Sequence, residues 1–140
     1  MKNRIVVFTI LLCTGCASGK WVLNNPLYNI QAVQLAQYGS DKTDTVFARI
    51  IRSTDKHYIT YSSEFLDINA TVSSLRILDS IRPSASKFYL LSDKLKQRLL
   101  EDEEEYRLKD VINNTNASTM DAEIHALWKA YLLAEESLTH

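Results

Sequence analysis

The sequence predicts an all-α protein, a small bundle of three or four helices. Two observations support this prediction. Residues that interrupt helices are rare, since the 140 residues include only three glycines and two prolines. Apolar residues recur at helical spacing, most regularly over residues 47–75. Long helices that each bury one apolar face account for both observations.

The pair Asn25-Pro26 predicts the start of the first helix, over residues 26–38. An asparagine side chain can cap the free amides of a helix, and proline is tolerated in the first turn. Gly39 stands where a glycine often follows the last turn, so we expect the helix to end there.

A heptad pattern of apolar residues predicts the second helix, between Asp44 as its N-cap and Pro83 as its stop. Side chains with a period near 3.5 keep one line of contacts facing a partner helix. The positions step alternately by four and three, and we call them the seam: Phe47, Ile51, Thr54, Tyr58, Tyr61, Phe65, Ile68, Val72 and Leu75.

A short β-hairpin near residues 46–62 is the alternative for the first part of this segment. It would turn at residues 53–56, and the Thr, Tyr and Ile residues that follow favour strands. A helix that breaks near Asp55 is also compatible with the pattern.

The segment 85–112 predicts a third helix, with an apolar face that includes Phe88, Leu95 and Tyr106. The acidic run 101–105 lies within it. Glu103 with Arg107, and Glu105 with Lys109, have the favourable four-residue spacing. The run is therefore interpreted as a solvated face, with a docking patch for a basic partner as the alternative.

A polar loop at residues 113–118 predicts the boundary before the last helix. Ser118 or Thr119 would cap that helix, which should end near Ser137. Its apolar face is formed by Ile124, Leu127, Trp128, Tyr131 and Leu132.

Catalytic and cofactor motifs are weak in this sequence. It contains no glycine-rich phosphate loop and no helical His-Glu-x-x-His, so we expect neither a cofactor nor a metal. Asp121 and His125 stand four apart and could orient a general base, or form a surface pair. The net charge is −1 and no basic patch occurs, which argues against nucleic-acid binding. We therefore expect no enzyme.

Tyr58, Tyr61 and Phe65 are the candidate partner-binding residues of the seam. A tyrosine hydroxyl needs a polar partner or water when its ring is buried. These side chains could therefore pack in the core, or they could line a groove that receives a peptide or helix of a partner.

The N-terminus has the pattern of a secretory signal peptide. Lys2 and Arg4 precede an apolar run over residues 5–12. The run is too short for a membrane-spanning helix, which needs about 20 residues. It matches the length of a signal-peptide core, about 7–15 residues.

The residues Leu12-Cys13-Thr14-Gly15-Cys16 resemble the lipobox of bacterial lipoproteins. Cys13 departs from the family pattern, which usually has Leu or another aliphatic residue there. The resemblance implies cleavage before Cys16, a diacylglycerol on the Cys16 thiol, and usually an acyl chain on the new amino group. A redox pair or a zinc site is the weaker alternative, because a structural zinc site needs four ligands and the chain has no further cysteine.

These predictions divide the chain into a signal peptide (1–15), a lipidated tether (16–25) and a helical domain (26–140). Ala17 after the lipidated residue resembles the sorting signal for the outer membrane, so we expect a lipid-anchored, periplasm-facing protein there. We expect a non-enzymatic binding or assembly factor of the cell envelope, pilotin-like or an accessory of secretion or pili, with a protein partner. An envelope enzyme or inhibitor, or a lipoprotein that excludes phage or blocks entry, remains an alternative.

Replacing Cys16 by Ser should abolish labelling with a fatty-acid probe and release the protein from membranes, because the thiol that carries the lipid is lost. Metabolic labelling followed by membrane fractionation measures both effects. The matched variant Cys13→Ser should keep the label. Labelled Cys16→Ser protein would contradict the lipobox assignment.

Overall fold

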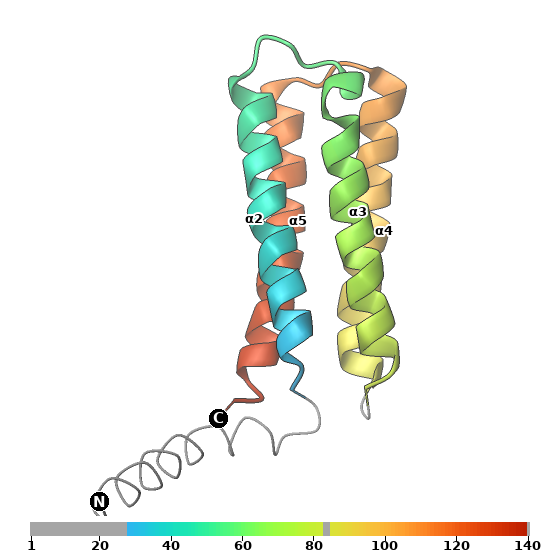
Figure 1. Cartoon of the computed structure of the whole chain (residues 1–140). Coiled ribbons are helices and arrows are strands. Elements are labelled where there is room, and N and C mark those ends of the chain that lie inside the picture. The colour runs from blue at the N-terminus through green and yellow to red at the C-terminus, as the bar shows by residue number, and fades with distance from the viewer. Residues whose placement is uncertain (1–27, 83–84, 140) are drawn as a thin grey trace, which may run out of the picture.

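A computed structural model describes residues 28–82 and 85–139. It consists of four helices: α2 (Ile30–Arg52), α3 (Tyr58–Ser80), α4 (Ala85–Lys109) and α5 (Asn114–Glu136) (Figure 1). The all-α prediction is confirmed. The β-hairpin alternative over residues 46–62 is wrong, because this segment consists of the end of α2, a turn at residues 53–57 and the start of α3. The predicted signal peptide, the tether, Cys16 and the pair Asn25-Pro26 lie outside the described residues. The predicted start of the first helix at residue 26 is wrong, because α2 begins at Ile30, where Asn29 Oδ1 accepts hydrogen bonds from the Gln31 and Ala32 amides.

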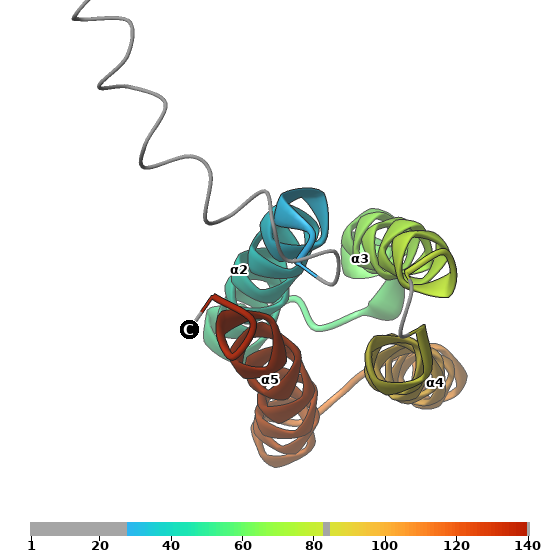
Figure 2. The same cartoon turned by 90° about the horizontal axis from the view of Figure 1, so that it is seen from below.

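The four helices form an antiparallel bundle in which each helix packs against the next, and α5 packs back against α2 (Figures 1 and 2). The turns from α2 to α3 and from α4 to α5 lie together at the upper end in Figure 1. The start of α2 and the end of α5 lie at the lower end. Viewed along the bundle, α3 and α5 occupy opposite corners.

The predicted single helix between Asp44 and Pro83 is wrong, because the chain reverses at residues 53–57. Polar side chains there bind the backbone and compete with helix continuation. Ser53 Oγ accepts a hydrogen bond from the Asp55 amide at 3.1 Å, and Asp55 Oδ1 accepts one from the His57 amide at 3.1 Å. The seam is thus folded back on itself, and the Phe47 and Phe65 rings meet edge to face at 5.9 Å.

The two turns at the upper end are joined by hydrogen bonds. The Tyr58 amide, at the start of α3, donates to the Asp110 carbonyl at 2.7 Å, and His57 forms an isolated bridge with Val111. The Tyr106 hydroxyl donates to the Lys56 carbonyl at 2.7 Å. The first amide of α3, which lacks a partner within its own helix, is thus bonded by the other turn.

Gly39 does not end a helix, as the sequence had suggested, but lies in the middle of α2. It makes room for the buried Trp128 of α5: a Cβ at residue 39 would lie 2.3 Å from Trp128 Cη2. The indole nitrogen donates to Thr43 Oγ1 at 3.1 Å, and that hydroxyl donates to the Gly39 carbonyl at 2.7 Å. The missing side chain thus lets α5 approach α2 closely.

The last helix begins earlier than predicted. Asn113 Oδ1 accepts a hydrogen bond from the Asn116 amide at 2.8 Å and caps α5 at Asn114. The expected polar loop 113–118 therefore forms mostly the first turn of α5. The third predicted helix, 85–112, is close to α4, which ends at Lys109.

A buried polar cluster connects α3, α4 and α5 at the lower end. The Tyr131 hydroxyl donates to Asp79 Oδ1 at 2.6 Å. The Arg82 guanidinium pairs with Asp79 and Glu135, and its Cζ lies 4.3 Å from the centre of the Phe88 ring. Burial raises the pKa of the Asp79 carboxyl. The cluster links the opposite corners α3 and α5 across the bundle.

Gly39→Ala should lower the free energy of unfolding by about 1–2 kcal/mol. Overpacking a core costs about 1–3 kcal/mol, and a clash with the rigid, fully buried indole falls in the upper part of that range, about 2–3 kcal/mol. The higher helix propensity of alanine offsets about 1 kcal/mol of this cost. Urea unfolding measures the change. Thr45→Ala, on the exposed face of the same helix, is the matched control and should cost less than 0.5 kcal/mol, the usual range (about ±0.5) for surface changes. A Gly39→Ala variant as stable as the parent would contradict the role of Gly39.

Candidate binding surface

The predicted partner-binding residues of the seam lie inside the bundle. Tyr61 is 2% exposed and Phe65 is 1% exposed. Tyr58 is half-buried, and its hydroxyl donates to Glu103 Oε1 at 2.7 Å. Burial, together with this hydrogen bond, raises the Tyr58 pKa to about 12. The described structure therefore uses these three side chains as core packing, the alternative that the sequence had left open.

The two described histidines both bind aspartates at the surface. His57 Nδ1 lies 2.9 Å from Asp110 Oδ2, which raises the histidine pKa. His125 Nδ1 lies 3.0 Å from Asp44 Oδ1, so its hydrogen-bond partner is on α2 and not Asp121 as predicted. Their side chains are 56% and 51% exposed. Neither ring lies in a deep pocket of the kind an enclosed active site requires.

The acidic run 101–105 is only partly a solvated face. Glu105 pairs with Lys109 at 2.6 Å as predicted, but Arg107 pairs with Glu104 instead of Glu103. Glu103 faces α3, where Glu103 Oε2 accepts a hydrogen bond from Asn69 Nδ2 at 2.5 Å. The run thus contributes to packing between helices as well as to the surface.

Asp102 is the buried member of this run, with 1% of its surface exposed. Its Oδ1 lies 2.7 Å from a guanidinium nitrogen of Arg98, which also reaches Glu123 at 2.6 Å. Burial raises the Asp102 pKa from 3.8 to about 6, although the charge of Arg98 acts in the opposite direction. The sequence could not distinguish this carboxylate from its exposed neighbours.

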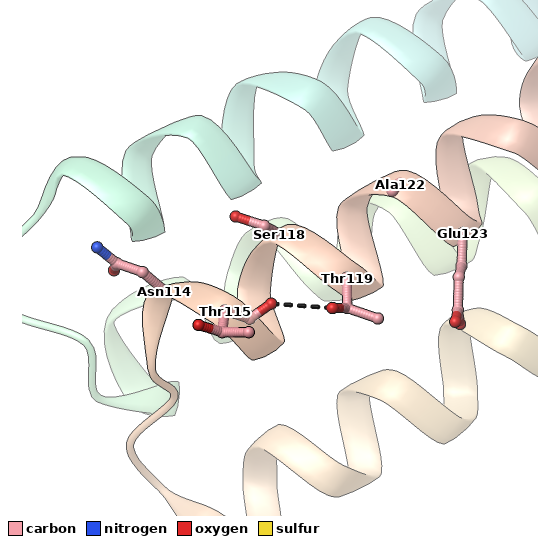
Figure 3. A pocket seen from close by; sticks show the side chains of 6 residues that line it. All are labelled: Asn114, Thr115, Ser118, Thr119, Ala122 and Glu123. Atoms are coloured by element: carbon pink, nitrogen blue, oxygen red, sulfur yellow. Dashed lines mark hydrogen bonds between the residues drawn. The ribbon is translucent and has the colours of Figure 1, made fainter.

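A polar depression lies at the start of α5 (Figure 3). Its lining consists of Asn114, Thr115, Ser118, Thr119, Ala122 and Glu123. The Thr119 hydroxyl donates to the Thr115 carbonyl at 3.0 Å, and Glu123 pairs with Arg98. The depression is wide open, and the Thr119 hydroxyl and the Glu123 carboxylate are already bound to other residues. These two groups therefore do not form a pair of nucleophile and general base.

The charged side chains of α3 all turn toward neighbouring helices. Glu64 pairs with Arg49 of α2 at 2.6 Å, and Asp67 accepts a hydrogen bond from Tyr38 at 2.8 Å. Arg76 pairs with Asp93 of α4 at 2.6 Å, and Asp79 joins the buried lower cluster. These four are the only Asp, Glu, Lys or Arg residues of α3. The outward side of the helix is therefore left without charge.

An uncharged stripe runs along the solvent side of α3 and its C-cap, opposite the seam. At 100° per residue its members fall on one side of the helix. We call it the outer stripe: Ile59, Ser63, Leu66, Ala70, Ser74, Ile77 and Ile81, all exposed. Its four large members are 66–76% exposed, and they are four of the five most exposed large apolar side chains among the described residues.

The other helices expose charge along their solvent sides. The exposed charged residues include Asp41, Arg49 and Arg52 on α2, Lys87, Lys94, Glu101 and Glu104 on α4, and Glu123, Lys129 and Glu136 on α5. A helix that is apolar on both sides is normally covered on both sides. The outer stripe is thus the strongest candidate interaction surface of the described bundle. Sequence reasoning missed it because it followed only the seam, although the second apolar period was visible.

An apolar hollow borders the lower half of the outer stripe. It lies between α2 and α3, with a volume of about 570 Å³. Its lining combines three apolar side chains, Leu35, Ile77 and Leu78, with Ser74 and the amides of Gln31 and Gln34. No charged residue lines it, so it suits an apolar side chain of a partner.

Within residues 28–82 and 85–139, no helix is long and apolar enough to span a membrane, and no group of three potential metal ligands occurs. Comparison of the chain with protein-family models, curated proteins and solved structures gave no match.

Asp102→Asn should change the pH dependence of stability. Between pH 4 and 6 the folded chain holds a proton on Asp102 that the unfolded chain has released, so the wild-type stability falls as pH rises through this window. Asparagine does not titrate, so this fall in stability with rising pH is absent from the variant. Its amide oxygen can still accept a hydrogen bond from Arg98. The variant should therefore gain about 1–3 kcal/mol relative to wild type between pH 4 and pH 6.5.

Urea unfolding at several pH values tests this expectation. Glu104→Gln, an exposed change in the same acidic run, is the control for the loss of one carboxylate, and the effect of Asp102→Asn on the pH dependence should exceed it. Identical pH profiles for Asp102→Asn and wild type would show that Asp102 titrates like an exposed carboxyl.

Proposed function

We propose that the chain is a lipid-anchored, non-enzymatic binding or assembly factor of the cell envelope, which acts through the outer stripe of α3. The observation that carries the proposal is the stripe itself. A helix that exposes four large apolar side chains and no charge along its solvent side is unusual on a protein that works alone. The lipobox resemblance supports the envelope location, and the enclosed seam leaves the outward faces as the surfaces available to a partner.

The bundle has the properties of a rigid binding module. Both upper turns are joined by backbone hydrogen bonds, and the lower end is joined by the Asp79, Arg82, Tyr131 and Glu135 cluster. A rigid helix face can bind a partner without the entropic cost of ordering it first. The lipid on Cys16 would restrict the search for that partner to the membrane surface.

Photo-crosslinking in the native envelope tests this proposal. A photo-reactive amino acid at Leu66, in the outer stripe, should give one discrete adduct that contains an envelope protein or a second copy of the chain. The same group at Leu133, a 53% exposed position on α5, is the matched control and should give none. The absence of an adduct from Leu66, or equal adducts from both positions, would contradict the proposal.

A further inference from the structure

We propose that the outer stripe of α3 packs antiparallel against the same stripe of a second copy, about a twofold axis at Ala70. This inference rests on the proposed use of the stripe as a binding surface, and it names the partner. A twofold interface must be self-complementary, because each residue meets its symmetry equivalent. The outer stripe meets that requirement in spacing, in size and in charge.

The spacing of the stripe is symmetric about Ala70. The other members lie four, seven and eleven residues before it, and again four, seven and eleven residues after it. An antiparallel arrangement about Ala70 therefore brings every member opposite another member. The facing pairs are Leu66 with Ser74, Ser63 with Ile77, and Ile59 with Ile81, while Ala70 faces itself.

The sizes of the facing residues are complementary near the axis. Leu66 meets the small Ser74, Ile77 meets the small Ser63, and the two Ala70 residues permit close approach of the backbones. Ile59 and Ile81 are both large, but they lie at the ends, where two helices that cross at a shallow angle of about 20° are slightly farther apart and still in contact. Each contact thus has the space that it needs.

A parallel arrangement fits less well. It would place Leu66 against Leu66 and Ile77 against Ile77, with Ser63 and Ser74 each facing its own copy. Large pairs would then hold the helices apart and leave voids at the serines, and packed interfaces contain few voids. The antiparallel arrangement is therefore favoured.

The hollow beside the stripe receives a side chain in this arrangement. Leu66 of the second copy falls at Ser74, which lines the hollow together with Leu35 and Ile77. Charge does not oppose the contact, because the flanking Glu64, Asp67 and Arg76 already have partners within their own bundle.

The proposed anchor is compatible with this dimer. Antiparallel packing places the start of α2, and hence the path to the lipid, at opposite ends of the pair (Figure 1). The helices are about 35 Å long, and the twelve residues from Cys16 to residue 27 can reach at most about 40 Å. A dimer whose helices lie along the membrane can therefore keep both anchors in one bilayer.

Cysteine crosslinking of the lipidated protein in its native membrane tests the arrangement. Ile59→Cys and Ile81→Cys chains, expressed together with different tags, should form a disulfide-linked pair on oxidation. Neither Ile59→Cys alone nor Leu133→Cys alone should do so. A link between two Ile59→Cys chains, or no link in any combination, would overturn the antiparallel dimer.

A charge at the axis provides a second test. Ala70→Glu would bring two carboxylates together and should reduce the yield of the Ile59→Cys–Ile81→Cys link at least tenfold, with an unchanged melting temperature. Ala126→Glu, at an exposed position on α5, is the matched control and should leave the yield unchanged. An unaffected yield for Ala70→Glu would overturn the dimer.

The failure of the dimer can be told apart from the failure of the proposed function. If cysteine links are absent but the photo-reactive group at Leu66 captures another envelope protein, the stripe binds that protein and only the second copy is wrong. If Leu66 captures nothing, the proposed function itself fails.

Discussion

The contact between Trp128 and Gly39 closes the bundle. The indole is fully buried and occupies the space that a side chain at residue 39 would need. Because residue 39 is a glycine, α5 and α2 can approach each other closely. This joins the last helix to the first and encloses the seam from the remaining side. In the closed bundle Phe65 packs against Phe47 of α2 and Tyr106 of α4 and is buried, so a partner can reach only the outward faces of the helices.

Polar interactions then fix the register of the enclosed bundle. At the upper end, one turn supplies the hydrogen-bond acceptor for the first amide of α3. At the lower end, buried charges of α3 and α5 meet across the core. Buried ion pairs add little net stability, because removing charges from water is costly, but a mismatched register would leave those charges unpaired. Such pairs favour one arrangement of the helices over others.

Much of the fold could be predicted from the sequence, because apolar periodicity depends on burial and burial dominates stability. The α-class, α4, and the apolar face of α5 followed from it. The ends of α2 could not be predicted, because a glycine can either end a helix or make room for a large side chain of another helix. Gly39 does the latter, and this becomes evident only when Trp128 is seen to pack against it. The turn at residues 53–57 interrupted a heptad that was continuous in sequence. Ser53 and Asp55 bind amides of this turn, and the reversal lets the two halves of the seam pack against each other.

The candidate surface shows a different limit of sequence reasoning. Tyr58, Tyr61 and Phe65 were visible as one apolar line, and a single line does not reveal whether a helix of the same chain covers it. Ile59, Leu66, Ile77 and Ile81 form the second line on α3. Its significance depends on knowing that α2 and α4 already pack against the first line and against the charged residues of α3.

The most direct measurement is the solvent accessibility of single methyl groups in the unlipidated Cys16→Ser chain. Nuclear magnetic resonance with a soluble paramagnetic agent would report on Ile59, Ile77 and Leu133 at increasing protein concentration. If the outer stripe binds a second copy, the Ile59 and Ile77 methyls become protected toward the level of the buried Ile68, while Leu133 on α5 stays accessible. Methyls of the stripe that remain as accessible as Leu133 at every concentration would contradict the account.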